Sequence, residues 1–408
     1  MRKSYFTYNS GVPSIMERSS MKIKEVRAVE IVLNPKPTTT PRTPSRARTF
    51  PMNRPVSRYA ASDRRGGHIS GSGWNRPACI VTAEDGTWGF GISLYGAPVT
   101  RIINDHFAPR LVGENCMATG KMWDLMVRSC AAFGATGLTS YAISAVDCAL
   151  WDLKGKILKR PVYELLGGPQ KEKIFCYASG FDQEWYMELG FKATKLFTPW
   201  GPEHGVEGLR KLEELVASTR EVIGDKVDLM LDAWTGFDIE HTVRVCETMK
   251  PYGLKWMEDY IPPDDFVGYE TVRQRLPWQT LATGEHWYLP TVFAAAAGRR
   301  LVDIFQPDVL WCGGITAATK ICHIAEANGI SVITHAGMNY PYGQHLAFAM
   351  PAITWGERSE GVSAPGVPLA EMVKLPGTSV IKDGYVAPSD APGFGLEIDE
   401  AWIESVMV

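Results

Sequence analysis

The sequence predicts an α/β protein in which a parallel (β/α) barrel of the TIM type follows a smaller α+β unit. From about residue 174 onward, short apolar runs end in a charged residue, and an amphipathic segment follows each run. The charged residues are Lys195, Asp232, Glu258, Glu285, Asp308 and His335. They are separated by 37, 26, 27, 23 and 27 residues, close to the roughly 30 residues of one strand–helix unit. The length of 408 residues also fits a large barrel with a second, smaller domain.

The first part of the chain contains a tail, a strand and an irregular segment. Residues 1–21 are mainly polar and lack the apolar stretch of a signal peptide, which predicts a flexible tail. Lys22–Leu33 carries β-branched and apolar residues in a strand-like order. Residues 34–60 are rich in Pro, Thr and Arg and have no period, so they cannot build a core of their own. We expect this segment to be disordered or to act as a mobile lid.

A hairpin and a helix complete the α+β unit, which is predicted to span residues 22–155. Ala78–Ala83 and Gly89–Leu94 are strand-like runs with a short turn sequence between them, which predicts a hairpin. Ser140–Gly155 carries an apolar stripe at helical spacing, and Ser140 is expected to cap its N-terminus.

Five barrel strands are placed by the apolar runs that precede the charged residues. They are Val227–Leu231, Leu254–Met257, Thr280–Ala282, Val302–Phe305 and Ile330–Thr334. The barrel is predicted to span residues 156–370. Beyond it the chain is rich in Pro and Gly and loses the rhythm, so residues 371–408 are expected to pack back on the α+β unit.

Composition excludes several classes of partner. The 42 basic and 45 acidic residues give a net charge of −3 without a sustained basic stripe, so nucleic acid is not an expected partner. No apolar run reaches the about 18 residues of a membrane-spanning helix. The eight cysteines are scattered without a C-x-x-C pair, which predicts reduced core residues. We therefore expect a cytoplasmic protein that does not bind a membrane.

The acidic residues that end successive strands predict a metal site, because the carboxyl ends of barrel strands converge on one pocket. Asp232, Glu258 and Glu285 hold such positions. Several buried carboxylates at one mouth require a cation, and oxygen ligands favour Mg²⁺ over zinc. Taken singly, each would more often be a helix N-cap, but their recurrence after similar apolar strands favours the metal. Asp259, next to Glu258, is expected to point off the opposite side of its strand.

Asp308 and His335 follow consecutive strands and predict an acid–base pair. A carboxylate beside an imidazole raises the pKa of the histidine and fixes its tautomer, as a general base requires. A single histidine after a strand is usually structural, and Asp308 is what makes His335 a candidate base. His286 is either a polar wall of the pocket or a residue hydrogen-bonded near it. Gly313-Gly314 either brings backbone close to a ligand or leads into a helix.

Several strings resemble a known family. Ser144-Ala145-Val146-Asp147-Cys148-Ala149-Leu150-Trp151-Asp152-Leu153-Lys154-Gly155 and Pro161-Val162-Tyr163-Glu164-Leu165-Leu166-Gly167-Gly168 resemble the end of the capping domain in the mandelate racemase-like branch of the enolase superfamily. From about residue 22 onward, the chain resembles the L-rhamnonate dehydratases of this branch. The strings that carry this likeness include Gly253-Leu254-Lys255-Trp256-Met257-Glu258, Ile261-Pro262-Pro263-Asp264-Asp265, Thr283-Gly284-Glu285-His286, Gln306-Pro307-Asp308-Val309, Trp311-Cys312-Gly313-Gly314 and Pro392-Gly393-Phe394-Gly395.

The resemblance implies a fold and a reaction. The fold would be a modified (β/α)₇β barrel with an α+β capping domain that supplies a lid, usually in a homo-oligomer. Mg²⁺ would bind Asp232, Glu258 and Glu285, and His335 would form a dyad with Asp308. The family acts on sugar acids.

The differences from the family pattern lie at positions that are expected to contact the substrate. Racemases of the branch carry Lys-x-Lys at the end of the second barrel strand, whereas this chain has Lys195-Leu196-Phe197. Phe197 cannot take a proton, which favours dehydration over racemisation. Small serines are expected after the base, but Ala336-Gly337-Met338 follows here, and arginines replace a histidine expected within residues 34–60. Glu357 is the nearest counterpart of a glutamate expected near the last barrel strand. The particular sugar acid therefore stays open.

The expected enzyme is a hydro-lyase that forms a 2-keto-3-deoxy sugar acid. Mg²⁺ would bind the substrate carboxylate and 2-hydroxyl, with Lys195 as a second positive centre. His335 would remove the C2 proton before the 3-hydroxyl leaves, and an L-rhamnonate-like acid is the expected substrate. Substrate contacts are predicted for Arg65 (less surely Arg64 or Arg76), His286, Trp200 and Glu357, although surface arginines on a mobile loop are equally consistent with the sequence. The alternatives are a racemase or epimerase of the same branch, a non-catalytic binding or scaffold protein, and a metal-dependent aldolase barrel.

Overall fold

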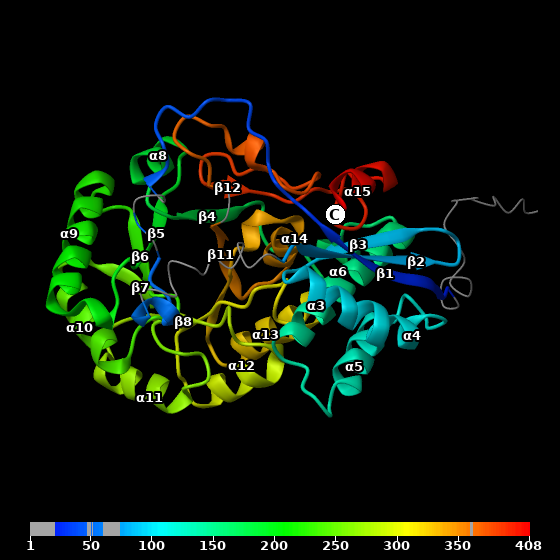
Figure 1. The fold of residues 1–408 in the computed structure, drawn as a ribbon, viewed down its shortest axis with the longest axis horizontal. Helices are drawn as coiled ribbons and strands as arrows, with labels where there is room; N and C mark the ends of the chain where they lie inside the picture. Colours follow the sequence, from blue (N-terminus) through cyan, green and yellow to red (C-terminus); the bar gives the residue numbers. More distant parts are fainter. Residues whose placement is uncertain (1–20, 47–49, 51, 60–73, 360–361) are drawn as a thin grey trace, which may run out of the picture.

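The protein consists of a small α+β unit beside a closed barrel of eight parallel strands (Figure 1). A computed structural model describes residues 21–46, 50, 52–59, 74–359 and 362–408. The predicted fold class, an enolase-like barrel with a capping domain, is confirmed. The predicted flexible tail lies outside the described residues, apart from Met21.

The α+β unit contains an antiparallel sheet in the order β1-β2-β3. The strands are β1 (Ile23–Ile31), β2 (Arg76–Ala83) and β3 (Trp88–Ile92), as the strand-like runs predicted. Its helices are α3 (Gly96–Arg101), α4 (Ala108–Leu111), α5 (Thr119–Ser129) and α6 (Leu138–Leu158), with a π-helical turn at Ile102–Phe107.

Helix α6 is buried on nearly every side because it lies between the sheet and the barrel. Strand β3 packs closely against this helix at two glycines. A Cβ at Gly89 would collide with the carbonyl oxygen of Ala149, and a Cβ at Gly91 with that of Ala145. The prediction that Ser140 caps this helix is wrong. The helix begins at Leu138, and the hydroxyl of Ser140 instead donates a hydrogen bond to the carbonyl oxygen of Trp311.

The barrel strands follow one another in sequence order, and β11 closes the ring by pairing with β4. They are β4 (Ile174–Ser179), β5 (Ala193–Phe197), β6 (Asp228–Asp232), β7 (Leu254–Glu258), β8 (Leu281–Thr283), β9 (Ile304–Phe305), β10 (Ser331–Thr334) and β11 (Ile353–Arg358). All five predicted strands are present, with ends shifted slightly. The helices are α7 (Val162–Leu165), α8 (Gln183–Glu188), α9 (Gly205–Ile223), α10 (Ile239–Met249), α11 (Phe266–Arg275), α12 (Leu289–Gly298), α13 (Gly314–Ala327) and α14 (Pro341–Ala349).

An apolar plug fills the barrel below its carboxyl end. It is formed by Tyr177, Ala193, Met230, Trp256, Ala282, Ile304 and Ile333. Because burying an unpaired charge is costly, the charged side chains of the strands gather above this plug, at the mouth.

The C-terminal segment contacts both parts of the protein. Strand β12 (Tyr385–Val386) pairs antiparallel with β4. Helix α15 (Glu400–Val406) packs on the α+β unit, where the amide of Val32 donates to the carbonyl oxygen of Val406 (2.8 Å). The predicted domain limits at residues 155 and 370 stay predictions.

The described part of the predicted lid lies across the barrel mouth. The amide of Asn53 donates to Thr198 O (2.7 Å), beyond β5, and the amide of Arg46 donates to Asp182 Oδ1 (2.8 Å), beyond β4. A short 3₁₀ turn, Pro55–Arg58, follows. Further 3₁₀ turns are Pro202–His204, Lys250–Tyr252, Gly337–Asn339 and Leu369–Met372.

All eight cysteines are buried and free, as predicted. Within the described ranges, no helix combines the length and apolar character needed to cross a membrane.

Candidate active site

Three carboxylates from neighbouring strands meet at the barrel mouth. Asp232 is the last residue of β6, Glu258 is the last residue of β7 and its register partner, and Glu285 follows β8 by two residues. One ligand oxygen from each lies within 4.8 Å of the others. All three side chains are buried. The structure thus brings together the three predicted metal ligands.

The chemistry of these carboxylates fits a divalent cation. Burial raises the pKa of all three, and that of Glu285 reaches about 7. Among the described residues, buried Glu285 Oε1 has no hydrogen-bond partner, and only His286 Nδ1 lies near it, at 3.5 Å, which is costly unless another group binds this oxygen. The donor set consists of oxygen atoms alone, as Mg²⁺ prefers.

Lys195 lies beneath the carboxylates and is completely buried. Its ammonium is 3.1 Å from Asp232 Oδ2 and 2.8 Å from Glu357 Oε1, and it also contacts Glu258 Oε1. Burial alone would lower the pKa of Lys195, but the three carboxylates outweigh it and raise the pKa well above its usual range. Lys195 therefore stays charged.

Glu357 belongs to the same cluster. It stands on β11 and accepts hydrogen bonds from Ser179 Oγ (2.6 Å) and the amide of Ala336 (2.8 Å). Burial opposes its ionisation, but Lys195 and His335 outweigh that effect and lower the pKa of Glu357 to about 2. Its carboxylate thus helps to fix the backbone directly after His335.

Two residues that support Glu258 were not predicted. Trp256 Nε1 and Gln306 Nε2 both donate to Glu258 Oε2, at 2.8 and 2.7 Å. A signal for Trp256 was present, because residues two apart on a strand share a face. Gln306 lies on the loop after β9, and no local pattern links it to Glu258.

His335 and Asp308 form the predicted pair. His335 Nδ1 lies 2.9 Å from Asp308 Oδ2, and Nε2 lies 3.3 Å from Glu285 Oε2. Because an ionised carboxylate only accepts hydrogen bonds, Asp308 holds the proton on Nδ1 and leaves Nε2 as the reactive nitrogen. Burial would lower the pKa of His335, but Glu285 and Asp308 outweigh it and raise the pKa well above its usual range.

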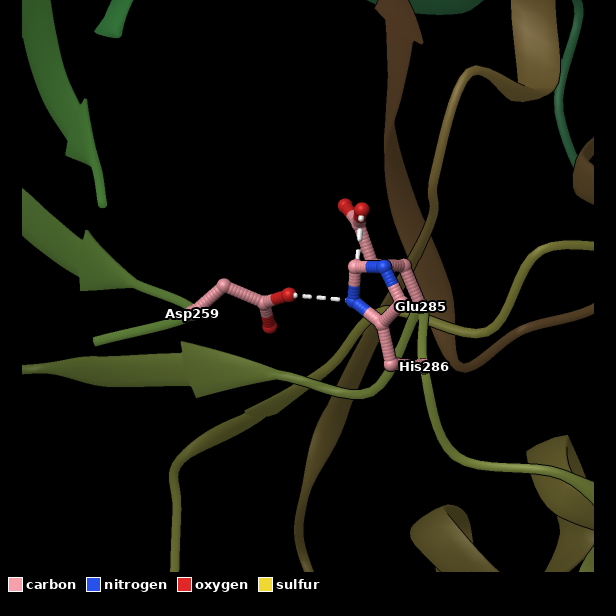
Figure 2. Close-up of side chains that lie close together, drawn as sticks. All are labelled: Asp259, Glu285 and His286. Atoms are coloured by element: carbon pink, nitrogen blue, oxygen red, sulfur yellow. Dashed lines mark hydrogen bonds and ion pairs between the residues drawn. The ribbon is translucent and has the colours of Figure 1, made fainter. Parts of the chain in front are cut away.

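Asp259 and His286 form a second carboxylate–imidazole pair beside Glu285 (Figure 2). His286 Nδ1 lies 2.9 Å from Asp259 Oδ2 and 3.5 Å from Glu285 Oε1. The expectation that Asp259 points off the opposite side of its strand from Glu258 stays a prediction. Its backbone leaves the extended region (φ 42°), so strand alternation no longer applies, and its carboxylate also accepts a hydrogen bond from Thr283.

A cavity of about 570 Å³ opens above these residues, between the barrel mouth and the α+β unit. Asp232, Glu285, Asp308 and His335 form its polar end. Residues from the α+β unit that line it include Leu33, Asn75, Arg76 and Tyr95. Phe197, which occupies the position of the second lysine, lines it as well.

The predicted substrate contacts lie in different places. Arg64 and Arg65 lie outside the described residues. Arg76 lines the cavity, and its guanidinium is 5.5 Å from the ring centroid of Tyr340. Trp200 packs edge-on against Phe50 (6.1 Å). Neither Trp200 nor His286 belongs to the described residues that line the cavity.

Comparison with protein families agrees with this geometry. Residues 182–402 match the family described as enolase C-terminal domain-like, and residues 77–167 match the N-terminal domain of mandelate racemase and muconate lactonizing enzyme. The chain belongs to the mandelate racemase-like branch of the enolase superfamily.

Several relatives of this enolase-superfamily chain are named as dehydratases. It is 41% identical over 263 residues to L-rhamnonate dehydratase of Saccharopolyspora erythraea, covering 64% of this chain and 67% of that protein. A Caldivirga maquilingensis relative is 36% identical over 330 residues, covering 78% of this chain and 80% of the relative. The crystal structure of rhamnonate dehydratase from Gibberella zeae complexed with Mg has a TM-score of 0.83 at 28% identity, covering 95% of this chain and 96% of that one. This superfamily member is accordingly an enzyme, a carbon–oxygen lyase related to sugar-acid dehydratases.

Proposed function

We propose that this enzyme is a Mg²⁺-dependent dehydratase of aldonic acids, with an L-rhamnonate-like acid as its substrate. The observation that carries the proposal is the position of the His335–Asp308 pair directly beside three buried carboxylates that fit one divalent ion. The names of the relatives support the substrate class.

His335 is the proposed base. Its Nε2 takes the proton from C2 of the substrate, while Asp308 stabilises the imidazolium through Nδ1. The same proton then passes to the 3-hydroxyl, which leaves as water. The substrate loses one water in total, and the enol that remains tautomerises to a 2-keto-3-deoxy acid.

Asp232, Glu258 and Glu285 would hold Mg²⁺. The ion supplies positive charge where the enediolate develops, which is the difficult part of removing a proton beside a carboxylate. Lys195 would act from beneath, since its ammonium fixes the orientation of Asp232 and Glu258. A cation bound to Glu285 would remove the largest of the influences that raise the pKa of His335, and so would lower that pKa towards the neutral base form.

A racemase or epimerase needs a second base on the other face of the substrate. The residue that would supply it in racemases of this branch is Phe197 here, and it lines the cavity. This disfavours inversion of C2 and supports elimination.

A screen of aldonic acids tests the proposal. Purified enzyme with Mg²⁺ is incubated with L-rhamnonate, L-mannonate, L-lyxonate and related epimers, and the 2-keto-3-deoxy product is measured. We expect turnover of one or a few acids that stops when the metal is chelated. Deuterium from D₂O in recovered, inverted substrate would instead identify an epimerase. Binding of Mg²⁺ without turnover of any acid would identify a binding protein.

The remaining expectations from the sequence stay predictions. These are a cytoplasmic location, a homo-oligomer, and substrate contacts by Arg65, His286, Trp200 and Glu357.

A further inference from the structure

The loop that carries Asp308 is held by side chains of the α+β unit. It connects β9 to α13, and several of its backbone groups point away from the barrel. Buried backbone groups need partners, and the α+β unit supplies them for four groups of this loop. The pairs are Leu310 O with Ser93 Oγ (2.6 Å), Trp311 O with Ser140 Oγ, Gly313 O with Trp123 Nε1 (2.9 Å) and Gly313 N with Ser144 Oγ (2.9 Å).

One face of helix α6 makes the central part of this contact. Ser140, Ser144 and Asp147 are spaced four and three residues apart, so they lie in a row. Asp147 accepts hydrogen bonds from the amide (2.8 Å) and the hydroxyl (2.7 Å) of Thr316. It therefore caps the N-terminus of α13 from another helix, which a carboxylate does well because of the partial positive charge there.

The glycine pair before α13 permits this close approach. Gly313 and Gly314 have φ values of 109° and 82°, a region that favours glycine. A Cβ at Gly314 would lie 2.5 Å from Asp147 Oδ2. The pair leads into α13 and allows the close contact with α6.

The same loop contacts the base through Asp308 and Trp311. Asp308 Oδ1 accepts a hydrogen bond from the amide of Leu310 (2.7 Å), and its backbone oxygen accepts one from Cys312 (2.8 Å). The ring of Trp311 lies 4.8 Å from that of His335 on one side and 5.7 Å from that of Tyr141, in α6, on the other. A shift of the loop would therefore move both Asp308 and the ring that packs on His335.

We propose that the Ser140–Ser144–Asp147 face of α6 positions the catalytic dyad, so that the α+β unit contributes to proton transfer as well as to the cavity. These three are positioning residues, because they act through the loop and do not reach the reacting atoms. The inference rests on the proposed function, in which His335 is the base.

The double substitution Ser140→Ala/Ser144→Ala tests the proposal. It removes two hydrogen bonds to the loop with little change in volume. Small misplacements of catalytic groups are expensive, so kcat should fall about 10- to 100-fold. The Kd for Mg²⁺ should stay within about twofold, since the metal ligands do not change. The KM should change less than kcat, because the loop forms only one part of the cavity wall. Substrate deuterated at C2 should show a larger isotope effect on kcat, because proton removal becomes slower relative to other steps.

Asp152 provides a matched control on the same helix. Like Asp147 it is buried and accepts two hydrogen bonds, here from the amides of Phe90 (3.0 Å) and Phe394 (3.0 Å), and these hold β3 and the C-terminal segment. It also pairs with Lys156 (2.7 Å). Both Asp147→Ala and Asp152→Ala should lower the Tm. Only Asp147→Ala should lower kcat and raise the isotope effect, and Asp147→Asn, which can still bond Thr316, should restore both. If Asp147→Ala does not fold, the double serine variant decides alone.

Hydrogen exchange separates failure of this inference from failure of the proposed function. In the double serine variant, peptides covering residues 306–316 should exchange faster than in the wild type, whatever the substrate. Unchanged exchange, or a kcat and isotope effect equal to those of the wild type, would overturn the positioning role. A wild-type enzyme without turnover of any aldonate, but with the predicted change in exchange, would overturn the proposed function while the loop contact stands.

Discussion

The two sides of the barrel mouth pair carboxylates with different cations. On the lysine side, Asp232, Glu258 and Glu357 surround Lys195. On the histidine side, Asp259, Glu285 and Asp308 surround His286 and His335. The carboxylates of both sides and Lys195 are buried, whereas His286 and His335 are half-buried, and both sides lie at the carboxyl ends of strands.

The two sides differ in whether the cation keeps its proton or can exchange it. Burial raises the pKa of Glu357 and of Glu285 alike. Lys195 and His335 outweigh burial at Glu357, whose pKa falls to about 2, whereas His335 and His286 do not outweigh it at Glu285, whose pKa is about 7. A lysine held by three carboxylates keeps its proton, so the lysine side can only orient ligands. The pKa of His335 is raised too, but the largest raising influence is Glu285, and a cation bound there would lower it, so the histidine side can give up and take back a proton.

The largest expected effect comes from replacing His335, the residue proposed to take the proton from the substrate. His335→Asn should abolish dehydration and also the exchange of the C2 proton with D₂O, because no other group of the proposed mechanism takes that proton. General acid–base catalysis is typically worth about 10²- to 10⁴-fold, so turnover should fall by at least that factor. NMR of the recovered substrate measures the exchange.

His323→Asn is the matched control, since His323 is an exposed histidine on α13, and it should behave as wild type. If exchange survives in His335→Asn, another residue is the base and the histidine side has lost its assigned role.

A smaller effect is expected from replacing Lys195, whose ammonium keeps its proton. Lys195→Met leaves three buried carboxylates without their cation, and kcat should fall about 100-fold through lost electrostatic stabilisation. Mg²⁺ should still bind, because all three ligands remain, and calorimetry measures this. The exposed neighbour Lys192 supplies the control substitution, Lys192→Met. A loss of less than about threefold would reduce Lys195 to a structural residue.

The smallest effect concerns a histidine that is buried away from carboxylates of the mouth. Burial lowers the pKa of His345 to about 3, the opposite direction to His335. An unfolded histidine takes up its proton near pH 6.5, so the unfolded state binds more protons below that pH. The free energy of unfolding should therefore fall as the pH drops from 7 to 5.

Urea denaturation at both pH values measures this fall. It should be smaller in His345→Gln, which keeps an acceptor for the amide of Tyr163, whereas His323→Gln should leave it unchanged. An equal fall in His345→Gln and the wild type would mean that other groups cause it.

Some site residues could be predicted because a single strand fixes them. Asp232 and Glu258 end apolar strands, so their positions at the mouth follow from the strand pattern and the barrel period. His335 and Asp308 could be paired because they follow consecutive strands. Asp259 is different, because its backbone is left-handed and strand alternation does not place its side chain, which bonds Thr283 and His286.

Other residues could not be assigned from local patterns. Ser140 has the chemistry of a helix cap, but its hydroxyl is used by a loop 171 residues away in the sequence. Gln306 gives no local sign that it supports Glu258, 48 residues earlier. Both depend on which loops the barrel brings together.

The sequence by itself determined the architecture and the identity of the charged residues at the mouth, because periodicity and burial act on each strand locally. Only the tertiary structure decided how those charges pair, with Lys195 beneath three carboxylates and His335 between Asp308 and Glu285. It also decided that a helix of the α+β unit forms hydrogen bonds with the loop that carries Asp308. The physical reason is that hydrogen bonds and ion pairs depend on distance in space, and closing a barrel brings together groups that are far apart along the chain.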